Sequence, residues 1–485
     1  MILLIILGGI FMGGARLLLP IATEYREEVQ ALASRELGQQ VEVESLKTSW
    51  RGYGPELILG NVDLINPKTG ARSLRVSEIH IGIGILDSLL HRAITVREIS
   101  FYRSQLLIKR RPDGAVVLAG MEGMKEAGGN SGAMFLLPFR LSLKQSEIFW
   151  ENQSIGAAPV HFTNVEFSIA NGENRHQIKA SMQLPGKAGG SMQLIADVRG
   201  DIQKPGAWSG EVYLRGNQLA ISSILQDRMP EGTELETGTG DVELWSSWNQ
   251  GHMYKLEGSA KFNNLTLAAL KTPATTAPAT VKIEHLGGRF RWQRQKSGWL
   301  LDLAQIELER NGKFWPKANL TFQSSIDSSG HTHIRSSIDF VRLGDILAIA
   351  HTLSIPSKKF EQAIGAIQPE ADLKQLQLSY QKGEDEPVWS ARGQLERISS
   401  KPWKDIPGVD NLNARFWLDQ NHGSIELQGR AVSANIPQLF RDKLELDELV
   451  GLLQWEKIPE HGWFVTAKKL IANNRDIKTA TRLRL

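Results

Sequence analysis

The chain has 485 residues and no cysteine, and its 56 lysine and arginine residues nearly balance 53 aspartate and glutamate residues. Its length exceeds that of one ordinary domain, although a repeat architecture can grow along one axis without adding separate cores. The net charge of +3 gives no general electrostatic reason to bind nucleic acid. The absence of cysteine excludes disulfides and thiolate chemistry, and it is compatible with an exported bacterial protein.

The segment before Thr23 is apolar apart from Arg16. A run of about 20 apolar residues can cross a bilayer as a helix, so residues 1–22 are predicted to form a single transmembrane anchor. A cleaved signal peptide is the weaker alternative, because the segment lacks a basic n-region and a small-x-small cleavage site before Glu24. The side chains expected to contact lipid are Ile2, Leu3, Leu4, Ile5, Ile6, Leu7, Ile10, Phe11, Leu17, Leu18 and Leu19.

Residues 23–38 are predicted to form a short amphipathic helix at the membrane surface, because apolar side chains recur on one helical face and Gly38 supplies a stop. From Val41 the apolar period changes to two, which indicates strands. We therefore expect an N-terminal β region over residues 39–121, interrupted by a short helix at 85–92.

The rest of the chain is expected to consist of β repeats separated by two loops. A glycine-rich loop is predicted at 122–132 and a Thr/Pro/Ala loop at 272–280, and the β repeats occupy 133–271 and 281–485. Short helical inserts are predicted between strands at 219–228, 344–353 and 436–441.

One hairpin is repeated within the second half of the chain. The aligned pairs are Leu286 with Leu449, Gly288 with Gly451, Trp292 with Trp455 and, after one insertion, Trp299 with Trp463. Each copy has the pattern of a strand, a polar turn and a second strand. The repeat predicts that the chain grew by adding hairpins rather than by enclosing one catalytic core.

The strands place apolar side chains on one face and polar side chains on the other, as the alternation from Ser424 to Gln428 illustrates. The apolar face must avoid water, and a second sheet, a helical layer or a guest lipid would each cover it. Few helices are predicted, which weakens the second option. The alternation alone is equally compatible with a sandwich core and with an open groove.

The order of anchor, surface helix and first strands resembles the AsmA-like superfamily, most closely its YhdP-type members. The segments that carry the resemblance are "GARLLLP" (14–20), "LGQQVEVESLKTSW" (37–50), "GPELILGNVDL" (54–64) and "VSEIHIGIGILDSLLHRAITVREISF" (76–101). The hairpins at 288–299 and 451–463 look like later elements of the same proteins. The similarity covers most of the chain and rests on pattern and order. Because YhdP-type proteins are much longer, we expect an N-terminal part of such a protein or a short form.

The resemblance implies a mainly β fold, in which one N-terminal transmembrane helix precedes an elongated, curved, repetitive antiparallel β-sheet groove with short helical inserts. It also implies a single-pass protein of the bacterial inner membrane, with its bulk in the periplasm, that moves phospholipid between the inner and outer membranes and supports the outer-membrane barrier. It favours the groove over the sandwich. The candidate lining side chains are Leu57, Leu59, Ile79, Ile81, Ile83, Phe101, Leu194, Phe290, Leu301, Leu303, Phe416, Ile425 and Leu427.

Signals of catalysis are weak throughout the sequence. No metalloprotease, nucleophile-elbow, Walker or dinucleotide motif is present. His331 and His333 share a strand face, but no third metal ligand is suggested nearby, so a solvent-facing pair is expected. Trp299 and Trp463 follow turn glycines and are interpreted as packing residues of their repeat. No catalytic residue, metal or cofactor is predicted.

The leading hypothesis is a non-enzymatic lipid conduit whose partners are phospholipid and the inner membrane, with envelope proteins as further candidates and no nucleic acid. The alternative is a non-enzymatic periplasmic β scaffold that recruits envelope-assembly partners, and a filled two-sheet core would favour it. A glycan hydrolase is a third hypothesis, supported only by generic carboxylates and tryptophans.

Overall fold

The computed structural model describes residues 25–37, 40–51, 54–65, 72–93, 95–112, 116–119, 140–153, 159–172, 174–201, 204–225, 228–269, 280–353, 358–382, 387–404, 406–438, 440–458, 462–476 and 478–484. The predicted anchor at 1–22 and the glycine-rich loop at 122–132 lie outside these ranges, as does the loop at 272–280 except for its last residue. Within the described ranges, no helix is both long enough and apolar enough to cross a membrane.

The chain divides into two compact units, and the first comprises Met1–Leu219 and Trp245–His252. Its elements in chain order are α2 (Arg26–Leu37), β1 (Gln40–Arg51), β2 (Gly54–Ile65), β3 (Arg72–Ile83), α3 (Ile85–His91), β4 (Val96–Tyr102), β5 (Gln105–Arg110), β6 (Val116–Leu118), β7 (Arg140–Asn152), β8 (Val160–Asn171), β9 (Arg175–Gln183), β10 (Ser191–Arg199), a 3-10 turn (Pro205–Ala207) and β11 (Ser209–Ala220).

The second unit comprises Ala220–Leu244 and Met253–Leu485. Its elements are α4 (Ile221–Leu225), most of β12 (Thr233–Asn249) and of β13 (His252–Ala269), β14 (Thr280–Gln295), β15 (Gly298–Arg310), β16 (Lys313–Phe314), β17 (Ala318–Ile326), β18 (Thr332–Arg342), α5 (Leu343–Thr352), α6 (Lys358–Ile367), β19 (Glu370–Gln381), β20 (Val388–Ser400), β21 (Gly408–Asp419), β22 (His422–Asn435), β23 (Leu444–Ile458), β24 (Gly462–Asn473) and β25 (Lys478–Arg484).

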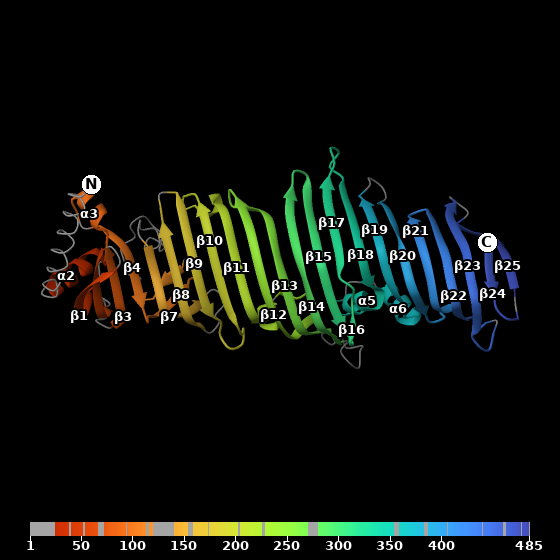
Figure 1. Cartoon of the computed structure of the whole chain (residues 1–485), viewed down its shortest axis with the longest axis horizontal. Helices are drawn as coiled ribbons and strands as arrows, with labels where there is room; N and C mark the ends of the chain where they lie inside the picture. Colours follow the sequence, from red (N-terminus) through yellow and green to blue (C-terminus); the bar gives the residue numbers. More distant parts are fainter. Residues whose placement is uncertain are drawn as a thin grey trace, which may run out of the picture. The chain divides into compact units, whose positions relative to one another are not determined.

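Each unit is built mainly from antiparallel strands that pair with their neighbours in sequence (Figure 1). From β17 onward, every successive pair of strands in the second unit is antiparallel. The first unit departs from this pattern, because β4 and β5 both pair with β7 in parallel. The mainly β, antiparallel prediction is therefore confirmed, with one parallel crossover that local alternation could not reveal.

Helix α2 protects the free edge of β1, where unpaired backbone groups would otherwise be open to pairing with another chain. Ser34 Oγ accepts the Val41 N–H at 2.9 Å, and Gln30 Oε1 accepts the Val43 N–H at 3.1 Å. Val29 packs against the buried cluster of β1, β2 and β3, in which Val76 is only 1% exposed. The predicted helix at 23–38 thus forms the N-terminal end of this core.

Bulges interrupt many strands and place non-glycine residues in the left-handed backbone region. Gln305 has φ 55° and Asn411 has φ 62°, and the strand register shifts at both positions. A bulge bends its strand and frees a backbone N–H. The Gln305 N–H donates to Asn319 Oδ1 at 3.2 Å, and the Arg397 N–H at the β20 bulge donates to Asn413 Oδ1 at 2.9 Å. The polar side chain of the next strand therefore completes each of these bends.

The repeated hairpin recognised in the sequence is present as β14–β15 and β23–β24. Trp292 pairs with Leu301 in the first copy, and Trp455 pairs with Val465 in the second. Both copies also contain a register shift close to the aligned glycine, between Gly287 and Arg289 and between Gly451 and Leu453. The two copies consequently share pairing and bulge position as well as sequence.

The short helices match the sequence only in part. α3, α4 and α5 fall within or close to their predicted ranges, whereas the described residues of 436–441 form turns rather than the predicted helix. A single backbone bond, from Phe440 N–H to the Ile436 carbonyl at 2.9 Å, closes one turn there. Helix α6 was not predicted, although Ala363, Ile364 and Ile367 have helical spacing.

Candidate functional site on the apolar face of the sheet

In the first unit, apolar side chains form a continuous row across the strands. Residues directly opposite each other on paired strands project from the same face, so the strand register defines the row. From β1 to β11 the row runs Leu46, Leu59, Ile79, Phe101, Leu143, Phe167, Ala180, Leu194 and Leu214. A parallel row contains Leu57, Ile81, Ile99, Leu141 and Ile169. We call the side carrying these rows the apolar face.

The second unit has equivalent rows. One runs from β13 to β19 through Gly258, Phe290, Leu303, Leu320, Ile338 and Leu376. It continues from β20 to β24 through Gly393, Phe416, Ile425, Leu453 and Ala467. A neighbouring row contains Trp292, Leu301 and Phe322, and another contains Ala414, Leu427, Gly451 and Leu470. These rows form the apolar face of the second unit.

The predicted lining residues fall on these two faces. Leu57, Leu59, Ile79, Ile81, Phe101 and Leu194 belong to the first unit's rows, and Phe290, Leu301, Leu303, Phe416, Ile425 and Leu427 belong to the second unit's rows. Ile83 lies past a register shift, opposite Val96. Leu59 is only 4% exposed within the core that α2 joins, whereas the other predicted residues are half-buried.

The half-burial of the predicted lining residues other than Leu59 has a structural cause. Among the described elements, strands contact mainly their neighbours in the sheet, and the helical contacts are those of α2 with β1 and of α5 with β14, β18 and β19. Within each unit, no described second sheet packs against the rows. Neighbouring side chains shield one another, but no described element covers most of the face from above. A filled sandwich core would bury such residues completely.

Glycines opposite aromatic residues shape the surface of the apolar face. A Cβ on Gly258 would lie 2.9 Å from the Phe290 ring, and one on Gly393 would lie 3.1 Å from the Phe416 ring. A Cβ on Gly423 would overlap the indole of Trp455. Each ring therefore occupies the space that a side chain on the facing strand would fill. Sequence reasoning missed these pairs, because each contact depends on the register of two strands.

The tryptophans of the repeated hairpin differ in their surroundings. Trp292 and Trp455 lie in the rows of the apolar face. Trp463 is 55% exposed, so it is not a packing residue as predicted. Tyr380 and Trp389 pair with each other near the ends of β19 and β20 and are also exposed, at 39% and 38%. Exposed aromatic rings thus follow the margin of the apolar face, where a ring can contact both apolar and polar groups.

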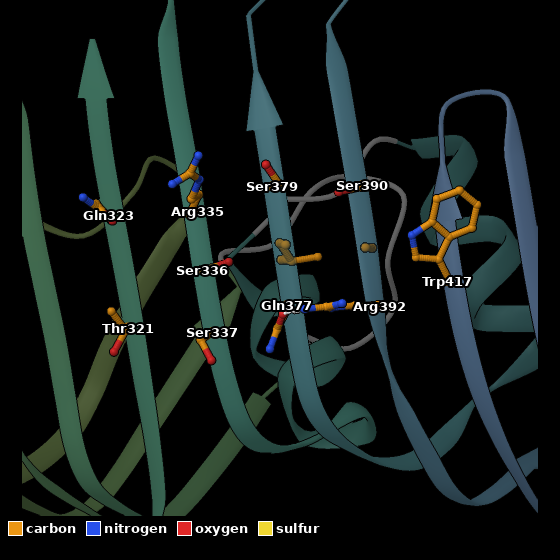
Figure 2. A pocket seen from close by; sticks show the side chains of 12 residues that line it. Thr321, Gln323, Arg335, Ser336, Ser337, Gln377, Ser379, Ser390, Arg392 and Trp417 are labelled. Atoms are coloured by element: carbon orange, nitrogen blue, oxygen red, sulfur yellow. Dashed lines mark hydrogen bonds between the residues drawn. The ribbon is translucent and has the colours of Figure 1, made fainter. Parts of the chain in front are cut away.

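The opposite, polar face carries a shallow hollow of about 430 Å³ in the second unit. Figure 2 shows its lining of serine, glutamine, threonine and arginine side chains on β17 to β20, with Trp417 at one side. Arg392 Nε donates to Gln377 Oε1 at 2.8 Å across the floor. No carboxylate lines this hollow, so it lacks the facing acids that glycoside hydrolysis requires.

A second hollow, of about 1010 Å³, lies beside α5 and α6. Several of its charged side chains form ion pairs with one another. Asp345 is 5% exposed, accepts from Arg310 at 2.8 Å and accepts from the Trp315 indole N–H at 2.8 Å. Asp372 bonds to Arg342 at 3.3 Å and also to Arg397. The network holds α5 against the strands, and the exposed carboxylates of Glu370 and Asp410 also line the hollow.

The histidine pair is not simply solvent-facing, because both rings lie next to Asp327. His333 Nε2 is 2.9 Å from Asp327 Oδ2, and His331 Nδ1 is 3.6 Å from the same oxygen. The hydrogen bond from His333, followed by the backbone N–H groups of His331 and Ser329, lowers the pKa of Asp327 to about 2. In the described part of the chain, no group of three or more His, Cys, Asp or Glu side chains is placed to hold a metal. We interpret the cluster as a turn-stabilising contact.

The described strands of each unit thus carry an apolar face and an opposite polar face. A family model described as YhdP protein matches residues 1–485. The chain belongs to the YhdP family. No curated protein and no solved structure matches it. Membership of the YhdP family indicates a lipid-transport role in the bacterial envelope, and the family generally consists of non-enzymatic scaffolds.

Proposed function

We propose that this YhdP-family protein is a passive conduit for phospholipid, anchored in the bacterial inner membrane by residues 1–22 and with its bulk in the periplasm. Phospholipid moves between the inner and outer membranes with its acyl chains on the apolar face, which supports the outer-membrane barrier. The observation that carries the proposal is the uncovered apolar face. Its rows cross successive strands without interruption by charge, and Phe416, Ile425 and Leu427 in them are only half-buried, although Ala414 and Ala467 are buried.

The free energy of burying apolar surface favours an acyl chain as the occupant of the apolar face. Each buried methylene contributes about 0.8 kcal/mol, so a chain lying along several rows gains enough to leave a bilayer at little net cost. The rows offer no hydrogen-bonding partner for a headgroup, which stays at the margin in water. The exposed rings of Trp389 and Tyr380 lie at that margin. Because no step changes a covalent bond, no catalytic residue is required.

Lipid mass spectrometry of the gently purified full-length protein tests the proposal. We expect phospholipid to copurify in more than the amount that one transmembrane segment retains. Leu427→Asp places a charge in the middle of the apolar face and should sharply reduce the bound lipid, because an unpaired charge is costly in an apolar setting.

Leu452→Asp is the matched control. Leu452 is 38% exposed and pairs with Glu426 on the polar face of the adjacent strand. The same chemical change there should leave the lipid content unchanged. Equal lipid loss in both variants, or a folded Leu427→Asp protein with normal lipid content and normal outer-membrane integrity, would contradict the proposed route.

A further inference from the structure

The short helix α3 exposes three leucines on one side. Leu86, Leu89 and Leu90 are 78%, 62% and 79% exposed, and no residue of α3 is buried. Their spacing of three and four residues puts them on one helical face. Leaving a leucine in water rather than burying it costs about 1.5–3 kcal/mol, so a cluster of this kind indicates a binding surface.

The exposed position of α3 is held by specific bonds. The Gly84 N–H donates to the Thr95 carbonyl at 2.9 Å, which ties the start of the helix to the strand that follows it. Ser88 Oγ accepts the Thr95 N–H at 2.9 Å, and the Ala93 N–H donates to the Ser88 carbonyl at 3.2 Å. Both ends of the helix are therefore fixed, and its leucines project from an ordered segment.

Three arginines lie at the end of the strands where α3 is found. Arg92 caps the helix, Arg97 follows at the start of β4, and Arg140 begins β7 opposite Glu98. All three arginines are exposed. Exposed leucines with arginines at the same end of the strands, beside the acidic Asp87 and Glu98, match a surface whose apolar interior lies beneath a layer of phosphates.

Helix α2 begins toward the same end of the first unit as α3. Ser34 contacts Val41, Gln30 contacts Val43, and Arg26 donates to the Glu44 carbonyl at 3.2 Å. Helix α2 therefore runs antiparallel to β1 and starts toward the Arg51 end of that strand. Arg51 pairs with Gly54, which abuts the Ile83 carbonyl just before α3. The first residues of α2, which the apolar segment 1–22 precedes in the sequence, therefore lie toward the end of β1 that is near α3.

We propose that α3 is an interfacial helix. Leu86, Leu89 and Leu90 insert into the anionic surface of the membrane that holds the N-terminal segment, and the neighbouring arginines bind lipid phosphates. This inference rests on the membrane anchoring in the proposed function. The proposed anchor at residues 1–22 is one contact with the membrane, and α3 would be a second. Two contacts would fix the orientation of the first unit on the bilayer.

The cysteine-free chain allows a direct measurement of depth. Leu89→Cys is labelled with an environment-sensitive fluorophore in the full-length protein, which is then reconstituted in vesicles of phosphatidylethanolamine and phosphatidylglycerol. We expect blue-shifted emission and quenching by spin-labelled lipids. Leu452→Cys, exposed on the polar face of the second unit, should show neither effect. Adding Arg92→Glu and Arg97→Glu should reduce quenching of the Leu89→Cys label, as should replacing the lipids with phosphatidylcholine alone.

Two results would overturn the proposal. An unshifted label without lipid quenching places α3 in water, and a blue-shifted label without lipid quenching shows that protein covers the leucines, from residues 1–24 or from a second copy. Adding Leu427→Asp to the labelled protein separates this inference from the conduit. Lipid content should fall while quenching persists, so loss of one readout does not entail loss of the other.

Discussion

At the residue scale, the glycines of the apolar face are as important to its shape as the aromatic residues opposite them. The indole of Trp455 occupies the space above Gly423. We predict that Gly423→Ala forces this ring to move and destabilises the second unit by about 1–3 kcal/mol, the usual cost of overpacking. Chemical denaturation measures the change in the free energy of unfolding.

Gly186 provides the matched control for that substitution. A Cβ there meets no atom within 4 Å, so Gly186→Ala should leave stability nearly unchanged. Similar losses in both variants would show that the effect comes from glycine replacement in general rather than from the Trp455 ring.

The hydrogen bonds that Asp327 accepts should depend on pH. The pKa of Asp327 in the folded protein is lowered from 3.8 to about 2, mainly by the His333 hydrogen bond. A lowered pKa means that the stabilisation is fully present above about pH 4 and is lost as the pH falls through about 2. The amide chemical shifts of Ser329 and His331, whose N–H groups donate to Asp327 at 2.8 and 3.0 Å, should titrate in that range.

Asp327→Asn retains an oxygen that can accept both backbone bonds but removes the titration. The same two amide shifts should then stay constant between pH 4 and pH 2. A transition of unchanged midpoint in Asp327→Asn would assign the titration to another group.

At the element scale, α5 depends on one buried carboxylate. Asp345 bonds to Arg310 and to the Trp315 indole, and Trp315 packs edge-on against Phe340 at 5.7 Å between ring centroids. We predict that Asp345→Ala destabilises the attachment of α5 by about 3–5 kcal/mol, because it leaves buried donors without an acceptor. Hydrogen exchange of the α5 amides measures that loss.

Asp345→Asn discriminates between the two bonds. The amide oxygen still accepts from Trp315, but the ion pair with Arg310 is lost, so exchange should be intermediate between that of the native protein and that of Asp345→Ala. If the amides of α5 exchange at the native rate in Asp345→Ala, packing alone holds the helix.

The strands also show which structural features can be predicted from a single sequence and which cannot. Alternation correctly predicted strands and the face on which Phe290, Leu303 and Ile425 lie, because a period of two is a local signal. The bulge at Gln305 could not be predicted, since glutamine in the left-handed region has no distinctive sequence pattern. Pairing of β4 with β7 was equally hidden, because it depends on contacts far apart in the chain. The Gly423–Trp455 contact required the register of two strands.

At the scale of the whole molecule, a conduit differs from a lipid-binding scaffold in how substitutions combine. Phe290 and Ile425 lie far apart along one row of the second unit, on β14 and β22. If lipid passes both positions in series, Phe290→Asp or Ile425→Asp alone should stop transfer, and the double variant should be no worse. The amount of bound lipid should instead fall stepwise, because each charge clears only its own part of the face.

Transfer of fluorescent phospholipid between donor and acceptor vesicles measures the first quantity, and lipid mass spectrometry of the same preparations measures the second. Leu452→Asp on the polar face should affect neither. A scaffold with independent lipid sites predicts that transfer and occupancy fall together, each variant removing its share. Transfer that declines in proportion to occupancy would therefore contradict a continuous route, because a path in series fails completely at its first interruption.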